Sequence, residues 1–248
     1  MSHWVKNAKI ARPKQGLNSL GRISPNTKTG CRMSRERLEK IDISLVEHGL
    51  QRLGMLHAET SDNLPQGTGT LVLVGPSAKM WPIFEKSAFA ADKAANPLDR
   101  WSYHVLSGVA QNLGARALFP FGGPPFLPFI SWAAQSGSCW PSPVGLLVHE
   151  TAGLFVSFRG ALAFDETFER DAATPRNPCL SCHRPCLDAC PVGALGAQGY
   201  DVPGCKSYLA SQGTDCMAAG CAVRRACPVG AEARTPEQSA FHMRAFLG

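Results

Sequence analysis

The chain has 248 residues, enough for one large domain or two smaller ones with a buried core. Its formal net charge is +6, but residues 1–32 hold seven basic residues and no acidic one, so residues 33–248 carry a net charge of −1. No apolar run reaches membrane-spanning length, and residues 1–30 hold no apolar signal-peptide segment. We therefore expect a cytoplasmic protein with no membrane partner, in which ten cysteines serve metal or redox chemistry instead of disulfides.

Residues 1–33 are predicted to form a basic tail. The segment is polar, contains Pro and Gly, and lacks any periodicity, which is typical of disorder. A nucleic-acid-binding arm or an organelle presequence would have a similar composition, and Met33 is an alternative start of the chain. Because a basic run alone is a weak indication of a partner, we expect no nucleic-acid partner.

The next segment begins with a predicted helix and a predicted strand. Apolar residues recur at helical spacing from Leu38 to Leu53, and Gly54 is expected to end this helix. The run Thr70–Val74 is short and apolar, and Gly75 and Pro76 close it, which indicates a buried strand.

A second helix is predicted over residues 97–113. Asn96 is in the N-cap position, Pro97 suits the first turn, and Gly114 follows the last apolar position. After it we expect a short strand at residues 117–119, a rigid Gly- and Pro-rich loop at residues 121–128, and a short helix through Trp132.

Two apolar runs, Val144–His149 and Leu154–Phe164, are predicted to form a β-hairpin joined by residues 150–153. Helices and strands thus interleave without a regular βαβ repeat, so the predicted fold class is α+β. A change in composition near residue 173 separates a domain at residues 34–172 from a cysteine-rich module at residues 173–248.

The cysteine-rich module carries the most specific signal. Cys179, Cys182, Cys186 and Cys190-Pro191 match the bacterial ferredoxin run, with one extra residue before the third cysteine. In that motif three thiolates hold one 4Fe–4S cluster, and the cysteine before proline binds the other cluster. Four more cysteines follow, the last also before proline. The predicted ligands are Cys179, Cys182, Cys186 and Cys227 for one cluster, and Cys190, Cys205, Cys216 and Cys221 for the other.

Other interpretations of these cysteines remain open. Cys179 to His183 also fits the attachment signature of a c-type haem, and paired Cys₄ zinc sites would use the same residue type. The two Cys-Pro pairs favour iron–sulfur clusters over both. Cys31 and Cys139 lie outside the two sets and are expected to be free thiols.

Three stretches resemble known families. Cys179–Pro228, with Cys205-Lys-Ser-Tyr-Leu209 inside it, is similar to the dicluster ferredoxin domain of epoxyqueuosine reductases and reductive dehalogenases. Gly145–Gly160 resembles the segment before that domain, and resembles more closely the cobalamin-processing CblC-type proteins. Thr70–Met80 together with Asn96–His104 is again CblC-like.

The resemblance implies a nitroreductase-like domain that binds a corrinoid, followed by a small ferredoxin-like domain with two 4Fe–4S clusters. It implies a corrinoid site near Arg159, His149, Gly122 and Gly123, in which Arg159 matches an arginine that contacts a carboxylate. From the residues alone, His149 is more simply a structural histidine, and Arg159 fits a structural ion pair equally well.

The loop Phe121–Pro125 lacks the acidic residue that epoxyqueuosine reductases use as proton donor. We therefore expect an oxidoreductase that passes electrons through two clusters to cobalamin. A ferredoxin-like electron carrier and an epoxyqueuosine-reductase-like enzyme are the alternatives. The expected partners are a corrinoid and an electron donor, which would be a flavodoxin, a ferredoxin or a reductase.

Overall fold

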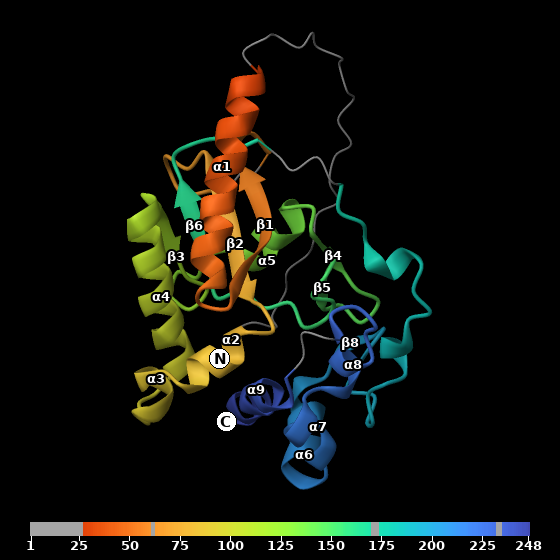
Figure 1. The fold of residues 1–248 in the computed structure, drawn as a ribbon. Coiled ribbons are helices and arrows are strands. Elements are labelled where there is room, and N and C mark those ends of the chain that lie inside the picture. Colours follow the sequence, from red (N-terminus) through yellow and green to blue (C-terminus); the bar gives the residue numbers. More distant parts are fainter. Residues whose placement is uncertain (1–26, 61–62, 170–173, 232–234) are drawn as a thin grey trace.

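The computed structural model describes residues 27–60, 63–169, 174–231 and 235–248 (Figure 1). A four-stranded antiparallel sheet with strand order β1-β2-β6-β3 forms its centre. The strands are β1 (Leu50–His57), β2 (Thr70–Pro76), β6 (Gly160–Phe164) and β3 (Arg116–Leu118). Helices and strands are mixed along the chain, so the α+β prediction is confirmed. Of the tail predicted at residues 1–33, residues 1–26 lie outside the described residues, whereas residues 27–33 belong to helix α1 (Thr27–Val46).

Both faces of the sheet are covered by helices. Successive side chains of a strand point to opposite faces. Val72 and Val74 of β2 accordingly pack with α1 and with α4 (Pro97–Leu113), while Leu71 and Leu73 pack with α5 (Phe129–Gln135) on the other face. A strand buried on both faces reads as a continuous apolar run, which explains the sequence of β2.

The helix predicted over residues 97–113 is confirmed as α4. Gly114 adopts a left-handed conformation with φ +65°, and its N–H donates to the carbonyls of Ala110 and Gln111. The predicted strands at residues 70–74 and 117–119 and the short helix through Trp132 correspond to β2, β3 and α5.

The helix predicted up to Leu53 is wrong at its end, because α1 stops at Val46 and Leu50 and Leu53 belong to β1. Gly49 turns the chain with φ +67°, and a Cβ there would lie 2.5 Å from the backbone of Met80. The register of β1 against β2 shifts between Arg52 and Gly54. Such a bulge lets two residues three apart both be buried in a strand, which imitates helical spacing.

The predicted hairpin of residues 144–164 is also wrong. Its first half contains β5 (Leu147–His149), which pairs with β4 (Cys139–Pro141), whereas its second half ends in β6 of the main sheet. A single bridge between His149 and Gly153 closes the turn between them. The second apolar run belongs to the main sheet instead of a hairpin, because β6 lies between β2 and β3, where all five of its residues are buried.

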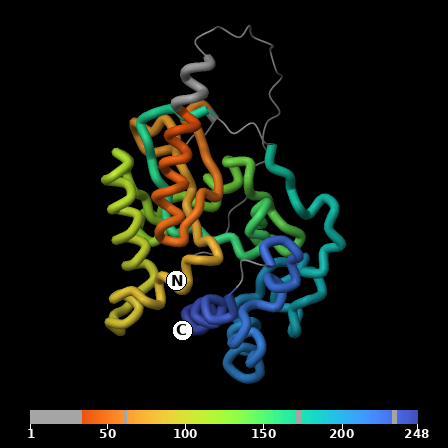
Figure 2. Tube along the Cα trace, in the orientation of Figure 1, coloured from red at the N-terminus to blue at the C-terminus, as the bar shows by residue number. Residues whose placement is uncertain are grey.

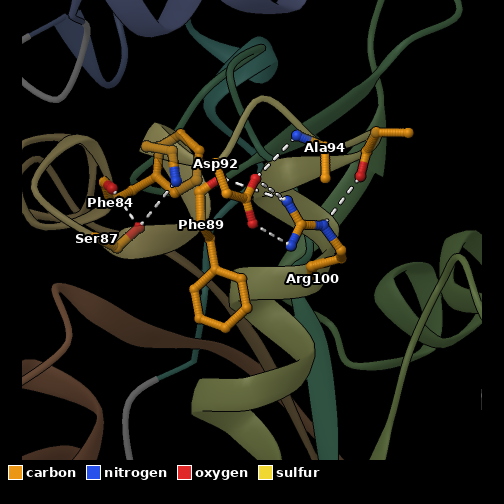
Figure 3. Close-up of polar contacts among 8 residues, drawn as sticks. Phe84, Ser87, Phe89, Asp92, Ala94 and Arg100 are labelled. Carbon is orange, nitrogen blue, oxygen red and sulfur yellow. Dashed lines mark hydrogen bonds and ion pairs between the residues drawn. The ribbon is translucent and has the colours of Figure 1, made fainter.

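A polar cluster fixes the entry into α4 (Figure 3). Helices α2 (Met80–Glu85) and α3 (Ala88–Ala91) precede it. Two guanidinium nitrogens of Arg100 donate to the carboxylate of Asp92 at 2.7 and 2.6 Å, and the N–H of Ala94 donates to the same group at 2.9 Å. The hydrogen bonds from Arg100, and then the one from Ala94, lower the pKa of Asp92. The cluster thereby holds the first turn of α4, which carries Asp99.

The cysteine-rich module consists of short elements. Two 3₁₀ turns and a small hairpin come first, and four helices follow. They are η2 (Pro178–Leu180), η3 (Pro185–Leu187), β7 (Leu195–Gly196), β8 (Gly199–Tyr200), α6 (Val202–Ser211), α7 (Thr214–Ala219), α8 (Ala222–Arg225) and α9 (Pro236–Leu247). No helix among the described residues has the length and hydropathy needed to cross a membrane.

Two contacts join this module to the sheet domain. Val148 and Leu154 pack into one apolar cluster with Cys186, Leu195 and Val223 of the module. Helix α9 returns to α2 (Figures 1 and 2), where Phe241 lies 5.3 Å from Trp81 and 6.1 Å from Phe84 between ring centroids.

Candidate metal centres

The eight cysteines of the two predicted sets all lie among the described residues, and none of them forms a disulfide. Cys179 and Cys186 lie in the two 3₁₀ turns, and Cys182 lies between them. Cys205 is on α6, Cys216 on α7, and Cys221 is the N-cap residue of α8. Short turns and helix ends thus bring thiols that are far apart in the sequence into one module.

The first group of thiols consists of Cys179, Cys182, Cys186 and Cys227. Burial raises the pKa of the Cys179 thiol, and the nearby thiols of the other three raise it further. The pKa of Cys186 is likewise raised by burial, and by Cys227 and Cys182. Cys227 therefore lies near the cysteines of the ferredoxin-like run, although 40 residues separate it from Cys186 in the sequence.

The second group consists of Cys190, Cys205, Cys216 and Cys221. All four line one cavity, and its apolar walls come from Leu195, Leu209, Val223 and Met243, among others. The pKa of the Cys205 thiol is raised by burial and, among the thiols, by Cys221, Cys190 and Cys216. The four thiols thus surround a common space between α6, α8 and α9.

The two groups have the members of the two predicted ligand sets, and their assignment as cluster ligands stays a prediction. The structure brings Cys190 to the second group and Cys227 to the first, so the two cysteines that precede proline are exchanged between the groups. Among the described residues, no three His, Cys, Asp or Glu side chains are placed to hold a metal ion between them.

Both groups contain a sulfur that accepts a hydrogen bond. The backbone N–H of Arg184 donates to Sγ of Cys182 at 3.3 Å, and the hydroxyl of Tyr200 donates to Sγ of Cys205 at 3.5 Å. Arg184 lies in the segment between Cys182 and Cys186, which is one residue longer than in the ferredoxin motif, and it adopts φ +58°, which is uncommon for a residue with a side chain. The ring of Phe246 stacks on Tyr200 and holds its orientation.

Arg159, predicted near a cofactor, is almost fully buried and points to α4. Its Nη2 forms an ion pair with Asp99, and its Nε donates to Oγ of Ser102 at 3.0 Å. Its guanidinium lies 5.7 Å from the ring centroid of Phe121, which places it beside the loop that contains Gly122. Burial lowers the pKa of Arg159, and Asp99 opposes that shift.

His149 is buried, and both its ring nitrogens have partners. The backbone N–H groups of Thr151 and Ala152 donate to Nδ1, each at 3.1 Å, so Nε2 carries the proton and donates to the carbonyl of Leu53 at 2.8 Å. Burial lowers the pKa of His149. The side chain thus fixes the turn after β5 against β1, which matches the structural interpretation.

The remaining predicted residues do not gather around His149. Gly122 is exposed, and Gly123 is packed against its own loop, where a Cβ would lie 2.6 Å from the N atom of Phe126. Cys139 is buried outside both groups, and burial raises the pKa of its thiol to about 12. The side chain of Cys31 lies outside the described part of the structure.

Sequence reasoning missed His242 of α9. Burial, and then the positive charges of Arg159 and Arg224, lower the pKa of His242 to about 4. Arg224 also acts on the pKa of Tyr200, which donates to Cys205 of the second group. His242 therefore feels the charge of Arg159 from the sheet domain and that of Arg224 from the cysteine-rich module. No local pattern signals this position, because the three residues come together only in the folded chain.

His242 gives a testable pH dependence. Its pKa is lower in the folded chain than in the unfolded chain, so protonation favours unfolding as the pH falls below about 6.5. Between pH 6.5 and 5.5 the free energy of unfolding should fall by about 1 kcal/mol more in the unmodified protein than in His242→Gln. Urea unfolding at several pH values measures the difference, and parallel pH profiles for the two proteins would contradict the assignment.

Comparison with known proteins finds a similar solved structure. No protein-family model matches the chain, and no curated protein matches it. The chain is similar to a B12-trafficking protein of C. elegans, CblC, described as a homologue of human MMACHC. The identity is 13%, the TM-score is 0.48, and the match covers 87% of this chain and 97% of that chain. These values are too low for the match to assign a family or a function to this chain.

Proposed function

We propose that this protein holds two 4Fe–4S clusters and passes single electrons through them to an acceptor bound by its sheet domain. One observation carries the proposal: eight thiols form two groups of four, and the two cysteines that precede proline are exchanged between the groups. Such an exchange is the ligand pattern of two-cluster ferredoxins.

The donor set fits these clusters. Each group offers four thiols, the ligand set that a cubane cluster requires, and the second group surrounds a cavity with apolar walls. When bound, such clusters supply one-electron transfer at potentials set by charge, hydrogen bonds to sulfur and exposure to solvent. Tyr200 and Arg184 would hold the ligand sulfurs of Cys205 and Cys182 through the hydrogen bonds described above.

We propose a corrinoid as the acceptor. The support is the resemblance of residues 145–160 to corrinoid-handling proteins, together with the surroundings of Arg159. Its Nη1 has no hydrogen bond among the described residues, whereas Nε and Nη2 are engaged. The guanidinium therefore retains donor capacity for an amide or carboxylate of a corrinoid side chain, beside Phe121 and the Gly122–Gly123 loop.

The surroundings of His242 and Arg224 support electron transfer from the second group to an acceptor near Arg159. Arg224 lies near Tyr200 of the second group and near His242, which in turn lies near Arg159. The second group is thus connected to the surroundings of Arg159 through neighbouring side chains. The second cluster would then be the donor to the acceptor.

Anaerobic titration with cobalamin tests the acceptor. Cob(II)alamin added to the protein should bind and change its visible spectrum to that of a form without the axial nitrogen base, because no free histidine nitrogen at position 149 replaces that base. With the clusters reduced, the corrinoid should then be reduced in turn. Bovine serum albumin at equal concentration is the control for unspecific binding. An unchanged spectrum in about tenfold excess of protein would favour the electron-carrier alternative.

A further inference from the structure

The loop that carries the first group of thiols exposes an apolar side chain. Leu180 lies between Cys179 and Cys182, and 82% of its surface is exposed. It is the most exposed of the large apolar residues reported for the described part of the chain. A leucine in this position stabilises no core, so its exposure next to two candidate ligands suggests contact with another molecule.

Two arginines flank Leu180 in the sequence. Arg176 and Arg184 are both exposed on the same loop, whereas Asp188 is the single acidic residue between positions 174 and 191. The positive charge is local, since residues 33–248 together carry a net charge of −1. An apolar contact with a basic rim is complementary to an acidic protein surface.

The first group can be reached from the surface through two of its thiols. Cys179 and Cys182 are partly exposed and lie in the segment 178–187, which follows the outer edge of the molecule on the side away from the main sheet (Figures 1 and 2), whereas Cys186 and Cys227 are buried. Cys190, Cys205 and Cys221 of the second group are partly exposed as well, so Leu180, and not burial of the thiols, selects the first group as the point of entry.

We propose that a small acidic electron-carrier protein docks on residues 176–185, named here the docking loop, and reduces the first cluster. The proposal rests on the proposed function, since it requires that the first group holds a cluster. One electron leaves the carrier, which is oxidised, and enters the first cluster, which is reduced, and no bond forms or breaks. The small apolar contact suits a transient complex, because electron-transfer interfaces are at the small end of specific protein interfaces.

Charge and apolar contact have separate roles in this docking. Arg176 attracts the acidic carrier and raises the association rate, an effect that salt weakens. Leu180 excludes water at the centre of the contact. Arg184 is left unchanged in the test below, because its N–H donates to the sulfur of Cys182 and its replacement would disturb a candidate ligand.

Stopped-flow reduction by flavodoxin hydroquinone tests the proposal. The probe is a flavodoxin, a small and strongly acidic protein, and the variants are Arg176→Glu and Leu180→Glu. At low ionic strength each variant should lower the second-order rate constant at least about tenfold. Added salt should slow the unmodified protein markedly and Arg176→Glu little. Arg35→Glu, an exposed arginine on α1, is the matched control and should react as the unmodified protein does.

Two further measurements separate the possible outcomes. Reduction by dithionite, which needs no protein docking, should change less than about twofold in the variants. Equal rates with flavodoxin for the variants and the unmodified protein, at unchanged iron content, overturn the docking proposal alone. A protein that binds no iron after anaerobic reconstitution overturns the cluster assignment, and the docking proposal with it.

Discussion

Replacing Cys205 by Ala should lower the iron content of anaerobically reconstituted protein from about eight to about four atoms per chain. Cys205 lines the cavity of the second group, where the remaining three thiols cannot complete the ligand set of a cubane cluster. The first group shares no cysteine with the second, so its cluster should survive. Labile sulfide should fall in the same proportion, and the visible absorbance should be about halved.

Two variants serve as controls for this experiment. Cys186→Ala should remove the other half of the iron, because Cys186 belongs to the first group. Cys139→Ala should retain all of it, because this buried thiol, with its pKa raised to about 12, lies in neither group. Loss of all iron in Cys205→Ala, or stoichiometric zinc without broad visible absorbance, would contradict the assignment of two clusters.

Replacing Asp99 by Ala should lower the free energy of unfolding by about 3–5 kcal/mol. Both partners of the Arg159–Asp99 ion pair are largely withdrawn from water, with side-chain exposures of 8% and 15%. The variant leaves the guanidinium of Arg159 buried with only Ser102 as a hydrogen-bond partner at its Nε. An unpaired buried charge costs far more than a pair contributes.

The double variant Asp99→Ala/Arg159→Met separates the cost of the unpaired charge from a loss of packing. Methionine fills a similar volume without a charge, so the double variant should regain most of the stability. Urea unfolding followed by far-ultraviolet circular dichroism measures all three proteins. A single variant within about 0.5 kcal/mol of the unmodified protein would show that the guanidinium is not buried as the structure has it.

The partition of the cysteines was predictable because its signal is local. The spacing of Cys179, Cys182 and Cys186 sets three thiols on one tight loop. The proline after Cys190 is typical of a cysteine that binds the other cluster. The structure places Cys190 at the cavity of Cys205, Cys216 and Cys221, although the spacing of the later cysteines is irregular. The ligation of two clusters by these sets stays a prediction.

The errors have a common physical origin in contacts between distant segments. Periodicity placed Leu50 and Leu53 in a helix, because the bulge in β1 depends on pairing with β2, which the spacing of apolar residues does not reveal. The hairpin predicted up to Phe164 was wrong, because β6 pairs with strands that lie far away in the sequence. The ion pair of Asp99 with Arg159, and the effect of Arg159 on His242, could not be predicted from local sequence either.

Helix α9 connects the proposed second cluster, which oxygen can destroy, to the solubility of the protein. Its Met243 lines the cavity of the second group, while its Phe241 covers Trp81 and Phe84 of the sheet domain. Oxidative loss of the second cluster would remove the support of α9 on one side and loosen its cover of these rings on the other. The aromatic surface so exposed favours aggregation. A protein damaged by air would then precipitate before its sheet domain unfolds.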